Sequence, residues 1–165
     1  MKAVVVYESL WGNTAAVARA IAEGIGGGAQ ALSTAEATAE VVAGADLLVA
    51  GSPVIGFRLP SDQIRESIRA NPGPAPAPPD LSHPPMRSWL ENLPEGTGRS
   101  AAFDTRVRGP FGSAAPQIAR RLERAGYRSI AKPQGFIVSG KYGPLRSGEI
   151  ERARRWGQEL AGSLR

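Results

Sequence analysis

Short apolar runs alternate along this chain with segments whose apolar side chains recur at helical spacing. Residues 3–7 form an unbroken run rich in β-branched side chains, and residues 46–51 form a second, as is typical of strands buried on both faces of a parallel sheet. Apolar residues three and four apart predict helices over residues 14–25, 60–71, 113–126 and 145–164. The alternation predicts an α/β domain in three layers, with helices on both faces of a parallel sheet.

The remaining segments give shorter or less regular signals. They predict a strand at 29–33, a brief helix at 36–43, a helical turn at 86–93, a fourth strand at 99–104 and a fifth strand split into 129–132 and 136–139. Ser113 is the expected N-cap of the helix that follows the fourth strand. Residues 72–85 hold seven of the chain's fourteen prolines, which predicts an extended insertion within one domain of residues 1–165. This insertion either connects two elements over the surface or recruits a proline-binding partner.

Composition narrows the possible chemistry. The chain has no cysteine, so we expect neither disulfides nor thiolate metal sites, and any redox chemistry must come from a bound cofactor. No apolar run approaches the length of a membrane span, and no signal peptide is recognisable, which favours a cytoplasmic location. The net charge is +5, but acidic residues interrupt the basic clusters and aromatic residues do not accompany them, so we do not expect nucleic-acid binding.

The turn after the first strand is the strongest candidate for a binding site. It places hydroxyl and amide side chains and a glycine directly before a helix, whose N-terminus favours anions. The turn has neither the lysine of a triphosphate-binding loop nor the GxGxxG of a dinucleotide-binding loop. Neutral donors at a helix N-terminus suit a terminal phosphate monoester, although an ordinary strand-to-helix connection would have a similar pattern.

A family resemblance appears at these residues. The segment Ser9-Leu10-Trp11-Gly12-Asn13-Thr14, after a VVVY strand, resembles the phosphate loop of the flavodoxin family, which holds the phosphate of flavin mononucleotide (FMN). The resemblance implies a five-stranded parallel sheet of order 2-1-3-4-5 and FMN as cofactor. Many flavodoxins have a hydroxyl where this chain has Trp11, so we expect one phosphate contact fewer.

Two further loops resemble those that enclose the flavin ring in this family. The first would supply an apolar wall, and its residues are Pro53, Val54, Ile55, Gly56 and Phe57. The alternative is that these side chains pack beneath the next helix. The second loop follows the fourth strand and contributes Asp104, Thr105 and Arg106. Electron-shuttling flavodoxins surround the ring with acidic residues, so a cation such as Arg106 would instead favour the reduced, anionic cofactor and raise its reduction potential.

These observations predict an FMN-binding, flavodoxin-like protein that acts in electron transfer or as a small oxidoreductase. The resemblance permits an electron carrier, a quinone reductase or a protoporphyrinogen-oxidase-like enzyme, served by a redox partner protein, acidic in charge, or by a small-molecule acceptor. No catalytic side chain and no metal ligand is expected, and His83, the single histidine, has no predicted role. The alternative is a flavodoxin-fold protein that has lost flavin and acts as an interaction module through its basic surface and its proline-rich segment.

Overall fold

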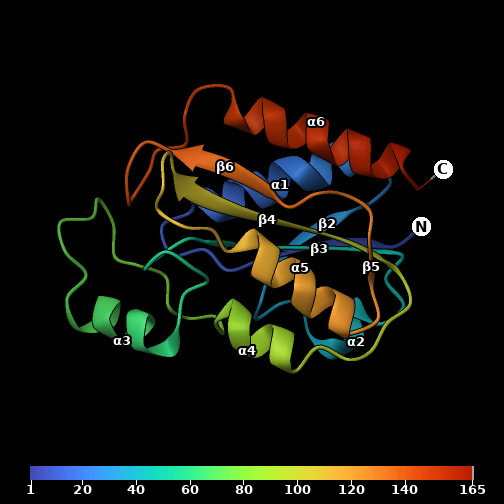
Figure 1. Ribbon diagram of the computed structural model, residues 1–165, viewed down its shortest axis with the longest axis horizontal. Helices are drawn as coiled ribbons and strands as arrows, with labels where there is room; N and C mark the ends of the chain where they lie inside the picture. Colours follow the sequence, from blue (N-terminus) through green and yellow to red (C-terminus); the bar gives the residue numbers. More distant parts are fainter. Residues whose placement is uncertain (165) are drawn as a thin grey trace.

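The apolar runs form the strands of one parallel sheet in the computed structural model, which describes residues 1–164. The strands are β1 (Ala3–Tyr7), β2 (Gln30–Ser33), β3 (Leu47–Pro53), β4 (Arg99–Val107), β5 (Arg128–Ser129) and β6 (Gln134–Val138). The helices are α1 (Asn13–Ile25), α2 (Ala39–Val42), α3 (Asp62–Ala70), α4 (Met86–Glu91), α5 (Ala115–Arg124) and α6 (Glu149–Gly162). Figure 1 shows the sheet between two layers of helices.

The strand order is β2-β1-β3-β4-β5, and β6 also pairs with β4, so β5 and β6 occupy one edge of the sheet in succession. All of these pairings are parallel. The predicted fold class, strand order and split edge strand are therefore confirmed.

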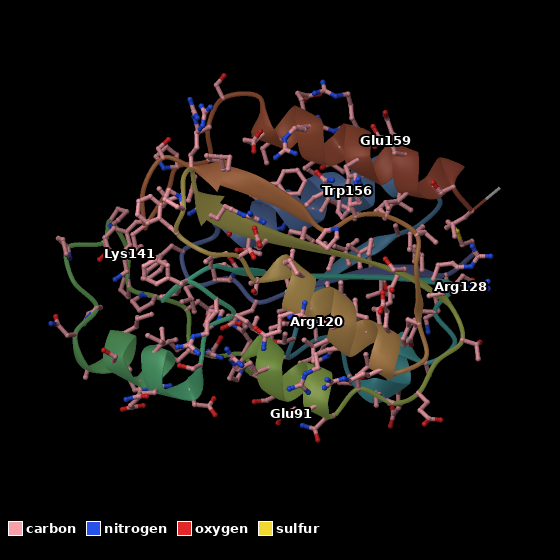
Figure 2. All side chains as sticks on the ribbon, viewed as in Figure 1. Glu91, Arg120, Arg128, Lys141, Trp156 and Glu159 are labelled. Atoms are coloured by element: carbon pink, nitrogen blue, oxygen red, sulfur yellow. The ribbon has the colours of Figure 1, made fainter. Side chains whose placement is uncertain are left out.

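Two apolar cores form because β1, β3 and β4 are buried on both faces. On one face α1 and α6 cover the sheet, and Trp156 lies between α6 and the strands, against Phe103 and Phe136 (Figure 2). On the other face α4 and α5 supply Met86, Trp89, Ile118 and Leu122, among others. Helix α3 lies beside the carboxyl ends of the strands, at the lower left of Figure 1.

Several predicted boundaries are wrong, for reasons that involve contacts distant in sequence. Strand β4 continues to Val107 because β6 pairs with it as far as that residue. Strand β3 continues through Pro53, which pairs with Thr105 at the end of the ladder, where a missing N–H costs least. Helix α6 begins at Glu149, four residues later than expected.

Helix α2 is also shorter than expected, because Thr38 caps it by accepting a hydrogen bond from the N–H of Val41 at 3.4 Å. The start of α5 is capped by a different residue from the one expected. Its N-terminus has no cap from Ser113, since the buried carboxylate of Asp104 accepts hydrogen bonds from the N–H groups of Ala114 and Ala115, both at 2.9 Å. A strand residue thus replaces the adjacent serine as the cap.

Helices α1 and α6 cross in direct backbone contact. A Cβ at Gly24 would lie 1.9 Å from the carbonyl oxygen of Arg154, and one at Gly157 would lie 2.2 Å from that of Ile21. Real Cβ atoms do not approach backbone this closely, so the two glycines set the distance between the helices. This crossing brings α6 onto α1, the helix that follows the 9–14 loop.

We expect Gly157→Ala to destabilise the protein by about 2 kcal/mol, because overpacking against backbone outweighs the gain in helix propensity of about 1 kcal/mol. The matched control is Gly162→Ala on the same helix, where the new Cβ has no heavy atom within 4 Å among the described residues, apart from its chain neighbours and the nearby backbone of its own helix. The control should be neutral or slightly stabilising. Urea denaturation of both variants measures the difference, and a Gly157→Ala variant as stable as the control would contradict the packing argument.

Candidate functional site

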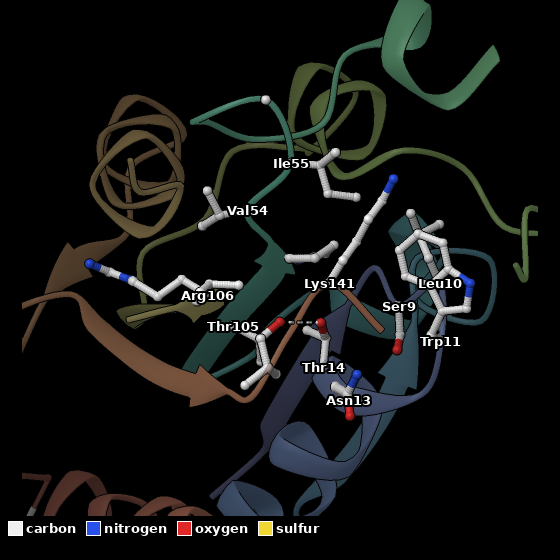
Figure 3. A pocket seen from close by; sticks show the side chains of 14 residues that line it. Ser9, Leu10, Trp11, Asn13, Thr14, Val54, Ile55, Thr105, Arg106 and Lys141 are labelled. Carbon is white, nitrogen blue, oxygen red and sulfur yellow. Dashed lines mark hydrogen bonds between the residues drawn. The ribbon is translucent and has the colours of Figure 1, made fainter. Parts of the chain in front are cut away.

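A cavity of about 310 Å³ opens at the edge of the sheet where β1, β3 and β4 end (Figure 3). Its lining comes from four connections that are distant in sequence. The lining residues are Ser9, Leu10, Trp11, Asn13, Thr14, Pro53, Val54, Ile55, Gly56, Thr105, Arg106, Val107, Val138 and Lys141. Eleven of the fourteen predicted site residues therefore meet around one cavity, and Gly12, Phe57 and Asp104 do not line it.

The 9–14 loop presents unused hydrogen-bond donors at the start of α1. Gly12 is the N-cap and adopts the left-handed conformation with φ of 93°, which turns the chain into the helix. Within the described chain, the backbone N–H groups of residues 10–14 have no hydrogen-bond acceptor. The hydroxyl of Ser9 accepts a hydrogen bond from the N–H of Ala15 at 3.2 Å, so its own hydrogen remains available. This loop can therefore receive an anion.

Two threonines join the 9–14 loop to β4. The hydroxyls of Thr14 and Thr105 lie 2.8 Å apart, and both residues are buried. One hydroxyl donates to the other, so one hydroxyl hydrogen of the pair is left for a ligand. The extension of β4 beyond Asp104 positions Thr105 for this contact, shown as a dashed line in Figure 3.

The connection between β6 and α6 forms a wall that the sequence reasoning did not assign to the site. The Nδ2 atom of Asn13 donates to the carbonyl of Tyr142 at 3.1 Å, and the rings of Trp11 and Tyr142 meet edge to face at 4.8 Å. The Nζ atom of Lys141 lies 6.0 Å from the Trp11 ring centroid, and its side chain extends across the cavity in Figure 3. The available signal was the glycine-flanked loop after the last strand, which must reach the same edge as the other strand ends.

Trp11 carries a hydrogen-bond donor on its ring. Its indole Nε1–H is buried and has no acceptor among the described residues. Buried donors are nearly always satisfied in folded proteins, by protein, water or ligand. Trp11 therefore contributes an aromatic wall and, among the described residues, an unpaired donor beside the loop.

The 53–57 loop contributes to two surfaces. Val54 and Ile55 line the cavity, whereas the Phe57 side chain is 66 % exposed and lies in a separate groove with Phe111. Phe57 has a φ of 68°, which is unusual for a residue other than glycine. A Cβ at Gly112 would lie 2.0 Å from the carbonyl oxygen of Phe57, so the loops that follow β3 and β4 are in backbone contact.

Asp104 and Arg106 form an ion pair beside the cavity that the sequence analysis did not anticipate. Asp104 is fully buried, caps α5 and accepts from Arg106 Nε at 2.6 Å and Arg106 Nη2 at 2.9 Å. Its carboxylate is therefore committed within the protein. The charge of Arg106 is offset by this ion pair, and Figure 3 shows its guanidinium pointing away from the cavity. Arg106 lines the cavity but is paired with Asp104, so it is not the free cation that the sequence argument about reduction potential required; Lys141 is the other cation in the lining.

Residues 1–164 contain no cluster of three or more His, Asp or Glu side chains arranged to hold a metal ion. None of the helices described is both long and apolar enough to cross a bilayer. The cavity lining combines neutral donors, an apolar wall, the paired Arg106 and Lys141.

Comparison with known proteins identifies the fold. No family model and no curated protein sequence matches the chain. Among solved structures, a flavodoxin from the domain Archaea matches with a TM-score of 0.69 and 21 % identity over 99 % of both chains. Flavodoxin 2 from Bacillus cereus matches with a TM-score of 0.64 and 16 % identity over 99 % of this chain and 97 % of that one. The flavodiiron core of Flv1 from Synechocystis sp. PCC6803 matches with a TM-score of 0.64 and 18 % identity over 99 % of this chain but 36 % of that one.

The protein therefore has the flavodoxin fold over nearly its whole length, as the resemblance in the 9–14 loop implied. The candidate site lies at the carboxyl ends of the strands, where ligands bind in open α/β sheets.

Proposed function

We propose that this protein binds FMN in the cavity at the ends of β1, β3 and β4 and acts in electron transfer. The observation that supports this most directly is the set of unused N–H groups at residues 10–14, which adjoin a cavity with an apolar wall. A phosphate monoester attached to a flat, largely apolar ring matches both parts. When bound, FMN would supply one- or two-electron chemistry that the side chains of a cysteine-free chain lack.

In this proposal each part of the site has a separate task. Ser9, Thr14 and the free amides of the 9–14 loop hold the phosphate, while Val54 and Ile55 pack against the ring and exclude water from it. Lys141 supplies positive charge at the cavity. No side chain is proposed as an acid or a base. The fold also occurs in proteins with different redox roles, so the identity of donor and acceptor is not part of the proposal.

We expect the purified protein, mixed with excess FMN and desalted, to retain flavin absorbance. Thr14→Ala should weaken FMN binding about tenfold, since it removes one hydroxyl from the buried pair with Thr105. Thr97→Ala is the matched control, because Thr97 lines a different cavity, at the opposite end of the sheet. Fluorescence titration with FMN and with riboflavin, which lacks the phosphate, measures the effect.

Absence of retained flavin in the unmodified protein would contradict the proposal. The interaction-module alternative would then become the better account of the basic surface and of the 72–85 segment. Equal losses in Thr14→Ala and Thr97→Ala would show that the 9–14 loop is not the phosphate site.

The potential of the bound cofactor should depend on Lys141. A cation at the cavity stabilises the reduced, negatively charged cofactor by a few kcal/mol at most, at an effective dielectric constant of about 20. We expect Lys141→Gln to lower the midpoint potential for full reduction. Lys132→Gln removes the same charge outside the cavity and should leave the potential nearly unchanged. Equilibrium redox titration of the two FMN-loaded variants measures their midpoint potentials. Equal potentials in Lys141→Gln and Lys132→Gln would exclude this role for Lys141.

A partner surface adjoins the cavity. The exposed rings of Phe57 and Phe111 form an apolar groove with Val54 and Val107, and the exposed side chains of Arg58 and Arg108 belong to the same two loops. Exposed aromatic residues with cations around them suit a protein partner that carries acidic residues around an apolar centre. We propose that an acidic redox protein docks here.

Reduction of the loaded protein by an acidic electron-donor protein should slow as salt is raised, because the attraction between exposed charges is screened. Arg108→Glu should slow it roughly three- to tenfold at low salt. Arg120→Glu, the same charge reversal on an exposed position of α5, should change the rate much less (Figure 2). Stopped-flow measurement at two salt concentrations distinguishes the variants, and a salt-independent rate would argue against this surface.

A further inference from the structure

The 72–85 segment returns from α3 to the 9–14 loop and contacts it through its last residues. Three hydrogen bonds join the consecutive residues Glu8, Ser9 and Leu10 to the end of this segment and the start of α4. Asp80 N–H donates to the carbonyl of Leu10 at 2.8 Å, Ser9 N–H donates to His83 Nε2 at 3.1 Å, and the N–H of Met86, the first residue of α4, donates to Glu8 Oε1 at 3.1 Å. The segment is therefore attached to the loop at successive positions. A connection that merely crossed the surface would not need these contacts.

His83 is held in the form that accepts a hydrogen bond. Its side chain is buried, and because Nε2 receives the Ser9 N–H, the ring is neutral and carries its proton on Nδ1. Nδ1 faces Asp80 Oδ1 at 3.7 Å, and Arg65 Nη2 donates to the His83 carbonyl at 2.8 Å. Burial lowers the pKa of His83 below its usual value. The ring is thus fixed on both sides.

Glu8 and Arg65 complete a buried polar layer beneath the loop. Arg65 Nη1 lies 3.7 Å from Glu8 Oε2, and among the described residues neither atom has a hydrogen-bond partner. Burial raises the pKa of Glu8 to about 7, so at neutral pH this carboxyl is only partly ionised. The layer therefore holds two titratable side chains, Glu8 and His83, next to the 9–14 loop.

We propose that His83 is a positioning residue for the anion site: by accepting the Ser9 N–H, it holds the 9–14 loop in the conformation that presents the following N–H groups to a phosphate. The 72–85 segment is then a strap for the site. The contact commits Ser9 N–H and the Leu10 carbonyl to the strap and leaves the amides of residues 10–14 unused. The effect on phosphate affinity rests on the proposed function, whereas the effect on the loop does not.

Acid should release the 9–14 loop, because protonation of His83 removes the acceptor for the Ser9 N–H. A protonated His83 has N–H groups on both nitrogens, so Nε2 would oppose the Ser9 N–H. Asp80 favours this charged form and Arg65 opposes it, while Asp62 and Arg87 act on Glu8. Because burial lowers the pKa of His83 in the folded protein, the contact is present at neutral pH and is lost only as pH falls through that lowered pKa.

Two variants of His83 test the proposal in the full-length protein. Gln has an oxygen that can replace Nε2 as the acceptor but does not titrate, whereas Leu fills the space without an acceptor. We expect His83→Leu to weaken FMN binding about tenfold at pH 7.5 and riboflavin binding much less. His83→Gln should bind FMN within about twofold of the unmodified protein. The phosphate of FMN titrates near pH 6, and Glu8 titrates as well. Both titrations change FMN affinity equally in the unmodified protein and in the variants.

On acidification from pH 7.5 through the lowered pKa of His83, the unmodified protein should lose more FMN affinity than His83→Gln does. Equal acid sensitivity in these two proteins would overturn the proposal, as would equal losses of FMN and riboflavin affinity in His83→Leu.

A second measurement does not depend on flavin. Amide hydrogen exchange followed by NMR should show the Ser9 N–H protected at pH 7.5 in the unmodified protein and in His83→Gln, and exposed in His83→Leu. If the unmodified protein binds no FMN, the proposed function fails, but the Ser9 amide still decides whether His83 positions the loop. If His83→Leu does not fold, the pH dependence of Ser9 protection in the other two proteins decides instead. Protection that persists in the unmodified protein after His83 is protonated would overturn the proposal.

Discussion

Parallel pairing of β1, β3 and β4 is the constraint on which the site depends. The register places Tyr7 beside Gly51, and Ser52 beside Asp104, so the three strands end at one edge of the sheet. Their apolar residues are almost fully buried under helices on both faces, and this burial is the main source of stability in such a fold. The 9–14 loop, the 53–57 loop and the end of β4 are therefore fixed relative to one another before any ligand binds.

Local sequence signals were sufficient for the strands, most helices and the 9–14 loop. Unbroken β-branched runs specify strands buried on both faces, and the polar turn with Gly12 before an amphipathic segment specifies an exposed helix N-terminus. The length of β4 was not predictable in this way, because Asp104, Thr105 and Arg106 interrupt its apolar pattern. A buried carboxylate is tolerated at Asp104 because it caps α5 and binds Arg106. No local sequence pattern reveals these contacts.

Side chains brought in from distant segments were the other part that sequence reasoning missed. Ser9 and His83 are 74 residues apart, and Asn13 and Tyr142 are 129 residues apart. Such contacts follow from the topology and from how each loop folds over the sheet edge, not from spacing. The charge near the cavity was misjudged for the same reason: the sequence does not show that Asp104 pairs with Arg106, nor that Lys141 lines the same cavity.

The proline-rich composition is consistent with a strap. Restricting the backbone with proline reduces the conformational entropy that the unfolded segment loses on folding, so a few contacts suffice to hold it. Pro84 and Pro85 directly follow His83, and the other prolines of the segment precede Asp80, so prolines flank the residues that contact the loop. Because its contacts end on Glu8, Ser9 and Leu10, any change that loosens the segment acts directly on the loop that presents its amides at the cavity.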